Sequence, residues 1–92
     1  MDTHTPAPPE NGEPPGELHS LLQALDSLLL PLAQLCVGKG VPIQAVEERL
    51  RRTFVEAARR RSEGANPQRL TSRISTLTGL TRREVARIQA LN

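Results

Sequence analysis

The spacing of leucine in the first half of the chain constrains the fold more than any other feature. Apolar residues recur there at steps of three and four: Leu18, Leu21, Leu22, Leu25, Leu28, Leu29, Leu32, Leu35 and Cys36. Such steps place side chains on one face of an α-helix. The spacing predicts a helix over about 17–37 with a continuous apolar stripe. Pro31 removes one backbone hydrogen bond, so the helix should kink there or split into 17–29 and 31–37.

A second helix is predicted over 42–63. Pro42 suits the first helical position, where its missing N–H costs no hydrogen bond. Acidic and basic side chains alternate along one face at a spacing of four residues, as Glu47–Arg51, Glu48–Arg52 and Glu56–Arg60. The other face should be buried, and its residues are Ile43, Val46, Leu50, Phe54, Ala57 and Ala58. Gly64 should end the helix.

A third helix is predicted over 67–78. Asn66 and Pro67 have the residue types of an N-cap and a first helical residue. Gly79 should end the helix, because glycine adopts a left-handed backbone at little cost. The expected inward residues are Leu70, Ile74 and Leu77.

The segment "ISTLTGLTRREVARI", residues 74–88, matches the spacing of a helix-turn-helix. The motif needs a small residue where the two helices cross, a glycine at the turn and an apolar plug. It then needs a capping residue and two inward anchors. The residues in these places are Ser75, Gly79, Leu80, Thr81, Val85 and Ile88. Thr81 and Glu84 also form a T-x-x-E capping box, which predicts a fourth helix over 81–91 with Leu91 inward.

Arginines on the expected outer side of this fourth helix favour DNA as the partner. The first turn of a recognition helix contacts base edges, and arginine binds guanine or phosphate with two hydrogen bonds. The preceding helix should add contacts to the DNA backbone. The expected DNA-binding residues are Thr71, Ser72, Arg73, Thr81, Arg82, Arg83 and Arg87.

Charge is distributed unevenly along the chain. The net charge of +2 combines an acidic first part, 1–40, with a basic part, 41–92, that holds 11 Arg against 5 Glu. A basic region of this kind favours a polyanionic partner. An alternative is a helical protein-interaction module, an adaptor whose arginines meet an acidic protein rather than DNA.

No run of residues has the alternation of a β-strand, so the predicted fold is all-α. It is a small four-helix domain over 17–92 with a C-terminal helix-turn-helix, preceded by a disordered tail over 1–16. The tail holds most of the prolines, and its only apolar residues are Met1 and Ala7. A domain of this size gains from self-association. The leucine stripe of 17–37 is therefore a candidate homodimer seam, although it could equally form the internal core.

Residues typical of catalysis or metal binding do not cluster in the sequence. His4 and His19 lack a second ligand at metal spacing, and we expect neither an enzyme nor a cofactor. Cys36 is the single cysteine, expected as a buried free thiol. Asp26 and glutamines interrupt the leucine-rich run, which argues against a membrane span, and no signal peptide is apparent. We therefore expect a cytoplasmic protein.

Two blocks of the chain resemble an uncharacterised family of proteobacterial proteins, carried as a domain of unknown function. The blocks are "LLLPLAQLCVGKGVPIQAVEERLRRTFVEAA" and "TSRISTLTGLTRREVARI". The resemblance covers about 18–90 and implies a regulator-like DNA-binding module. Members of the family generally continue beyond the helix-turn-helix, whereas this chain stops at Asn92.

Overall fold

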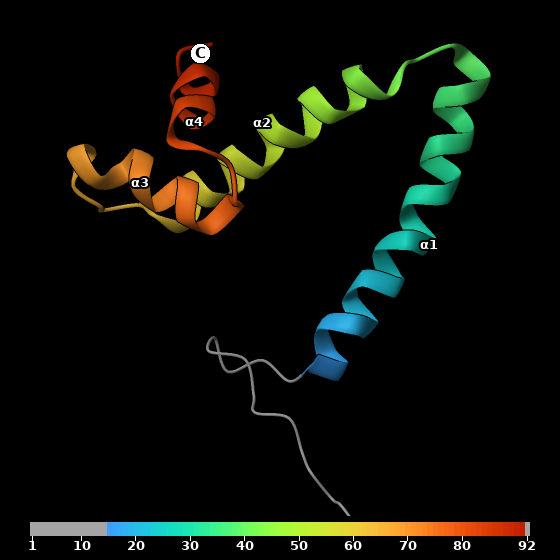
Figure 1. Cartoon of the computed structure of the whole chain (residues 1–92), viewed down its shortest axis with the longest axis horizontal. Helices are drawn as coiled ribbons and strands as arrows, with labels where there is room; N and C mark the ends of the chain where they lie inside the picture. Colours follow the sequence, from blue (N-terminus) through green and yellow to red (C-terminus); the bar gives the residue numbers. More distant parts are fainter. Residues whose placement is uncertain (1–14, 92) are drawn as a thin grey trace, which may run out of the picture. The chain divides into compact units, whose positions relative to one another are not determined.

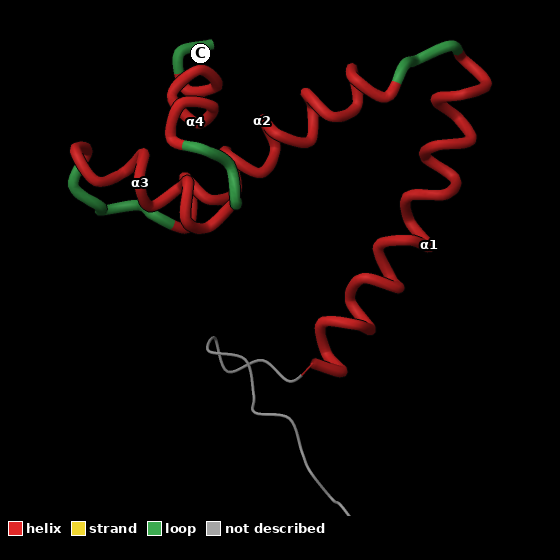
Figure 2. The backbone as a smooth tube through the Cα atoms, in the orientation of Figure 1, coloured by secondary structure: helices red, strands yellow, loops and turns green. Residues whose placement is uncertain are grey.

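The computed structural model describes residues 15–91, which contain four helices and no strand (Figures 1 and 2). The helices are α1 (Pro15–Lys39), α2 (Ile43–Arg61), α3 (Pro67–Thr78) and α4 (Arg82–Gln89). The all-α prediction is confirmed for these residues. Backbone contacts divide the chain between Val41 and Pro42. One unit therefore contains α1, and the other contains α2, α3 and α4.

Helix α1 is uninterrupted from Pro15 to Lys39, so of the two outcomes predicted at Pro31, a kink or a split, the split is wrong. Proline removes only one hydrogen bond from the ladder, and the leucines on both sides are strong helix formers. The helix also begins before the expected residue 17. The rest of the tail predicted as disordered, 1–14, lies outside the described residues.

The C-terminus of α1 has a Schellman arrangement built on Gly40. Gly40 has a φ of 75°, and its N–H donates to the carbonyl of Val37 at 3.3 Å. The N–H of Val41 donates to the carbonyl of Cys36 at 2.8 Å. Only glycine adopts this left-handed backbone without strain. Gly40 therefore ends α1, whereas Gly38 lies inside the helix.

The leucine stripe of α1 is exposed along its full length. Its leucines range from 41% exposed at Leu25 and Leu29 to 71% at Leu28, and Cys36 is a half-buried free thiol rather than a buried one. By length and composition alone, residues Gly16–Lys39 are also sufficient to cross a membrane. The stripe is thus an apolar surface that its own unit leaves uncovered.

The unit of α2, α3 and α4 has a small aliphatic core. The five buried apolar residues are Val55, Ala58, Ile74, Val85 and Ile88, and the half-buried Leu70 and Leu80 pack against them. Every helix of the unit contributes, and Ile74 and Val85 are fully buried. The predicted inward positions of α3 and α4 are confirmed near the centre of the unit. They are wrong at its edges, where Leu77 and Leu91 are exposed.

The predicted buried face of α2 is wrong for most of its length. Ile43, Leu50 and Phe54 are exposed, Phe54 by 54%, and Ala57 is also exposed. Of the predicted residues, Ala58 is buried and Val46 is half-buried. Val55, which was not predicted, is buried on an adjacent face, since one residue corresponds to a turn of about 100° around the helix. This unit therefore buries a short side of α2 against α3 and α4 and leaves the longer apolar side of α2 uncovered.

Candidate nucleic-acid interface

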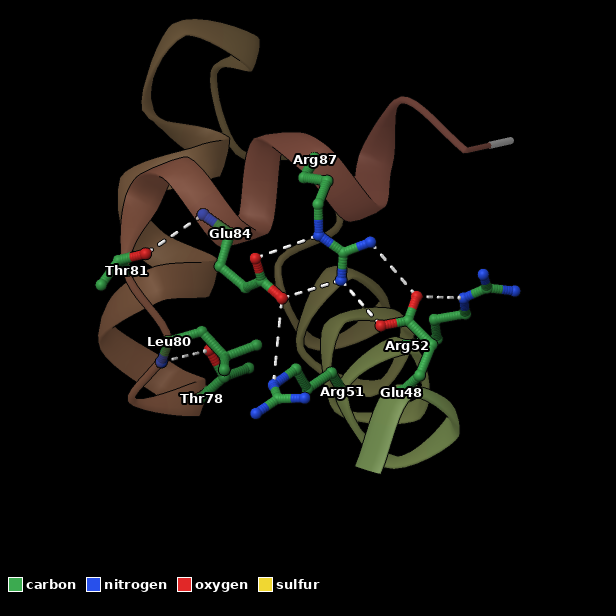
Figure 3. Close-up of polar contacts among 8 residues, drawn as sticks. All are labelled: Glu48, Arg51, Arg52, Thr78, Leu80, Thr81, Glu84 and Arg87. Atoms are coloured by element: carbon green, nitrogen blue, oxygen red, sulfur yellow. Dashed lines mark hydrogen bonds and ion pairs between the residues drawn. The ribbon is translucent and has the colours of Figure 1, made fainter. Parts of the chain in front are cut away.

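The turn between α3 and α4 is fixed by Gly79 and by hydrogen bonds from its neighbours. Gly79 has φ 80° and ψ 1°, and its N–H donates to the carbonyl of Ser75 at 2.9 Å. The hydroxyl of Ser75 donates to the carbonyl of Leu80 at 2.6 Å, and the N–H of Leu80 donates to Oγ1 of Thr78 at 3.2 Å (Figure 3). Ser75 therefore does more than leave room at the crossing, because it ties α3 to the residue after the turn.

Thr81 caps the N-terminus of α4, as the sequence predicts. Its Oγ1 accepts a hydrogen bond from the backbone N–H of Glu84 at 3.1 Å. The other half of the capping box is absent among the described contacts, because the Glu84 carboxylate accepts from Arg87 instead. The cap nevertheless gives α4 a defined start at Arg82, one residue after the predicted start at 81.

The inner side of α4 is held by apolar packing and by one polar contact. Val85 and Ile88 are buried in the core, and Leu80 packs beside them. The hydroxyl of Thr71 on α3 donates to Oε1 of Gln89 at 3.1 Å. Thr71, expected to contact the DNA backbone, is half-buried and joins α3 to α4.

Arg87 is not the free recognition residue that the sequence suggested. Its guanidinium donates to both carboxylate oxygens of Glu48 on α2, at 2.8 and 3.2 Å, and to Glu84 at 2.7 and 3.0 Å (Figure 3). Glu48 also accepts from Arg52 at 2.9 Å, and Arg51 lies 3.9 Å from Glu84. Arg87 therefore joins α2 to α4. The Glu48 partner, 39 residues away, gave no local signal in the sequence.

This network changes the acidity of its members. Hydrogen bonds from Arg87 and then Arg52 lower the pKa of the Glu48 carboxyl to about 2. The hydrogen bond from Arg87 likewise lowers the pKa of Glu84, and its two carboxylate partners raise the pKa of Arg87. These directions favour the ionised forms of Glu48, Glu84 and Arg87.

Two of the three ion pairs expected along α2 are present. Glu48 pairs with Arg52, and Glu56 accepts from Arg60 at 2.8 Å. Glu56 also accepts two hydrogen bonds from Arg59, and these bonds, followed by that from Arg60, lower its pKa to about 2. The third expected pair, Glu47–Arg51, does not form in the described part of the chain. Arg51 lies close to Glu84 on α4 instead. Most arginines of α2 are thus neutralised by nearby acids.

Arg82 and Arg83 differ from the four paired arginines of α2, which are Arg51, Arg52, Arg59 and Arg60. Both are exposed in the first turn of α4, and neither has an ion-pair partner within residues 15–91. The N-terminus of a helix also carries partial positive charge from its unpaired N–H groups. The first turn of α4 therefore presents concentrated positive charge to solvent.

Helix α3 holds the remaining predicted contacts. Arg73 is exposed and its Nε donates to Oγ of Ser62 at 3.1 Å, which positions the side chain without neutralising it. Ser72 is half-buried, and Thr71 is engaged as described. Arg69 lies one helical turn before Arg73, is exposed, and has no ion pair within the described range. Arg69 was not among the residues predicted to bind DNA, although its spacing of four from Arg73 places both on one face of the helix.

An open groove of about 850 Å³ runs between α2 and α4. Its apolar lining includes Val55, Ile88 and Leu91, and its arginines are Arg49, Arg52, Arg59 and Arg60. Three of these arginines are already paired with Glu48 or Glu56. The groove thus combines an apolar surface with partly neutralised positive charge. Within residues 15–91, no group of acidic, histidine and cysteine side chains could hold a metal ion.

Comparison with known proteins adds no assignment to this geometry. No family model, no curated protein and no solved structure matches the chain.

Proposed function

We propose that the unit formed by α2, α3 and α4 is a helix-turn-helix module that binds double-stranded DNA. One observation carries the proposal: α4 exposes two unpaired arginines in its first turn, while its other sides are fixed to α2 and α3. In such modules the second helix lies in the major groove, and its N-terminal residues contact base edges. Arg82 and Arg83 occupy these positions, and either can bind guanine O6 and N7.

The contacts around Arg82 and Arg83 support a role in recognition. Base readout requires a helix held in one orientation, because a bidentate hydrogen bond tolerates little displacement. Val85, Ile88 and the Arg87–Glu48 pair anchor α4 through its middle and C-terminal half. Because α4 is already ordered, DNA binding by Arg82 and Arg83 does not carry the entropic cost of ordering the helix.

Helix α3 supplies the proposed backbone contacts. Arg69 and Arg73 are exposed one turn apart on α3, and cationic side chains at such places bind phosphate and fix the register of the protein on the duplex. Thr81 and Ser72 remain candidates for further phosphate contacts. Thr71 and Arg87 are assigned to holding the helices together. The proposal is consistent with the regulator-like family that the sequence resembles, and with the expected cytoplasmic location; family membership stays a prediction.

Selection from a pool of random duplex DNA with the purified full chain tests this function. We expect enrichment of a defined motif, lost in the double variant Arg82→Ala, Arg83→Ala. The matched control is Arg59→Ala, Arg60→Ala, which removes the same charge from arginines that pair with Glu56; it should recover the same motif. No enrichment by the wild-type chain, or an unchanged motif in the α4 variant, overturns the proposal.

The groove between α2 and α4 favours a second candidate, a protein-interaction module. Its apolar lining and arginines fit an amphipathic helix with acidic residues at its edges. This candidate predicts no motif from the DNA pool. It also predicts that substitution of Arg49 and Leu91, rather than Arg82 and Arg83, abolishes binding to the partner.

A further inference from the structure

The leucine stripe of α1 follows a strict seven-residue repeat. Residues 18–38 divide into three segments, LHSLLQA, LDSLLLP and LAQLCVG, each with leucine at its first and fourth positions. The fifth position is Leu22, Leu29 and then Cys36. The seventh holds the compact residues Ala24, Pro31 and Gly38. A straight α-helix drifts by about 20° per seven residues, so a strict repeat keeps its stripe in contact only with another helix that supercoils around it.

The polar residues of α1 lie together on the opposite side. They include His19, Gln23, Asp26 and Gln34, at steps of four, three and eight. No Lys or Arg occurs in α1 before Lys39. A helix that lies on a membrane surface generally carries Lys or Arg on its polar face, and a spanning helix places few ionised groups near its middle. Asp26 in the central part of α1 therefore favours a protein partner over lipid.

We propose that α1 pairs with α1 of a second copy of this chain in an antiparallel two-helix contact. The first and fourth positions of the repeat alternate across the seam, with Leu25 packing against the partner's Leu28. Leu18 then meets the partner's Leu35, and Leu32 meets the partner's Leu21. This register buries every leucine at the first and fourth positions, all of which the α1 unit by itself leaves exposed.

Charge and side-chain size select the antiparallel orientation. Glu17 lies in the first turn of α1 and Lys39 in the last. Antiparallel pairing places unlike charges and unlike helix dipole ends near each other, whereas parallel pairing places like ends together. It also puts the seventh positions of the two helices on one side of the seam, where Ala24 and Gly38 allow close approach. The fifth positions meet on the other side and extend the apolar contact.

One consequence of this arrangement rests on the proposed DNA-binding function. The register is centred between Asp26 and Ser27, so the two Lys39 residues lie about 37 Å apart at a rise of about 1.5 Å per residue. Half-sites on DNA separated by one helical turn are about 34–36 Å apart. The two chains thus leave the antiparallel contact at points whose separation is of the same size.

Sedimentation equilibrium of the full chain at about 10–300 µM, without DNA, tests the contact. We expect a mass of twice the 10.1 kDa of one chain. Leu28→Lys places a charge in the centre of the seam and should shift the protein to monomer. Leu30→Lys is the matched control: Leu30 is also exposed but occupies the sixth position, away from the seam, and should leave the dimer intact. Circular dichroism reports whether each variant keeps its helices.

Double electron–electron resonance, which measures the distance between two spin labels, determines whether the two α1 helices are antiparallel or parallel. A spin label on Cys36, the single cysteine, should report about 28 Å between backbone positions in the antiparallel pair, against about 10 Å in a parallel one. Because Cys36 borders the seam, a second variant carries Cys36→Leu with Gln34→Cys on the polar side, where about 22 Å is expected. A monomer at 300 µM, a dimer that survives Leu28→Lys, or the short distance overturns the proposal. A wild-type monomer that binds phosphatidylcholine–phosphatidylglycerol vesicles also overturns it and assigns the stripe to lipid.

Discussion

The Arg87 guanidinium and the Glu48 carboxylate form a two-point ion pair between α4 and α2, with Nη2 2.8 Å from Oε1 and Nη1 3.2 Å from Oε2. The pair fixes the C-terminal half of α4, and Thr81 caps its beginning. Between these two points, Arg82 and Arg83 remain without an acidic partner in the described part of the chain. The same helix therefore contains arginines with two different roles.

Removing Arg87 should lower stability. The variant Arg87→Ala leaves the Glu48 and Glu84 carboxylates without their main partner, so the midpoint of urea unfolding should fall. Arg83→Ala removes an equal charge from the same helix but breaks no ion pair. Its free energy of unfolding should therefore stay within about 0.5 kcal/mol of the wild-type value. Equal midpoints for Arg87→Ala and wild type would show that the pair contributes nothing at this exposed site.

The Glu48 contacts make stability depend on pH in a defined direction. Folding lowers the pKa of Glu48 from its ordinary value near 4.5 to about 2. The ionised carboxylate therefore stabilises the fold fully above pH 4.5, and this contribution is lost as the pH falls towards 2. Glu48→Gln should be less stable than wild type at pH 7, and the difference should close between pH 4.5 and 2.

A matched acid, Glu47, makes no ion pair within residues 15–91. Glu47→Gln should follow the wild-type curve of unfolding free energy against pH. The effect of Glu48 is moderated by solvent, because its pair is exposed. A difference between wild type and Glu48→Gln that stays constant from pH 7 to pH 2 contradicts this account.

Gly79→Ala should destabilise the α2–α4 unit by about 1–2 kcal/mol, the cost of a left-handed backbone for a residue with a Cβ. A Cβ at Gly79 would meet nothing within 4 Å, so the backbone is the only source of the cost. Gly79→Asn should recover part of the loss, because asparagine tolerates this conformation. Urea unfolding measures both variants. Equal losses for Ala and Asn would point to a cause other than the backbone of the turn.

Salt should weaken DNA binding with a slope that reports the number of phosphate contacts. If Arg69 contacts phosphate, Arg69→Ala should reduce the slope of log K against log salt by about 0.9 and weaken binding equally to all sequences. Arg60→Ala, whose guanidinium is already paired with Glu56, should change the slope by less. Fluorescence anisotropy from 50 to 200 mM salt measures both slopes. Equal slopes for Arg69→Ala and wild type would remove Arg69 from the interface.

Local signals predicted the helices well. The range 67–78 matches α3 without error, since Asn66 caps it by accepting from the N–H of Gln68 and Gly79 ends it. The prediction for α2 was less accurate, because the helix runs over Ile43–Arg61 rather than over 42–63. Helix caps and terminal glycines depend on residues only a few positions apart. They can therefore be recognised from the sequence alone.

Contacts between distant residues could not be predicted in the same way. Apolar residues lie on two adjacent faces of α2. Val55 is buried and Phe54 is exposed because α3 and α4 pack against only one of these faces. Arg87 had the spacing of a recognition residue, and only its position opposite Glu48 shows that it holds α4 in place. Arg82 and Arg83 were predicted to be exposed, and the structure agrees.

An NMR titration tests whether the first turn of α4 contacts DNA. Duplex DNA recovered by selection is added to the uniformly ¹⁵N-labelled full chain, and amide shifts are followed residue by residue. We expect the largest changes at Thr81, Arg82 and Arg83, with little change at Arg59 and Arg60. Saturable binding that leaves the amides of 81–83 unmoved would contradict it.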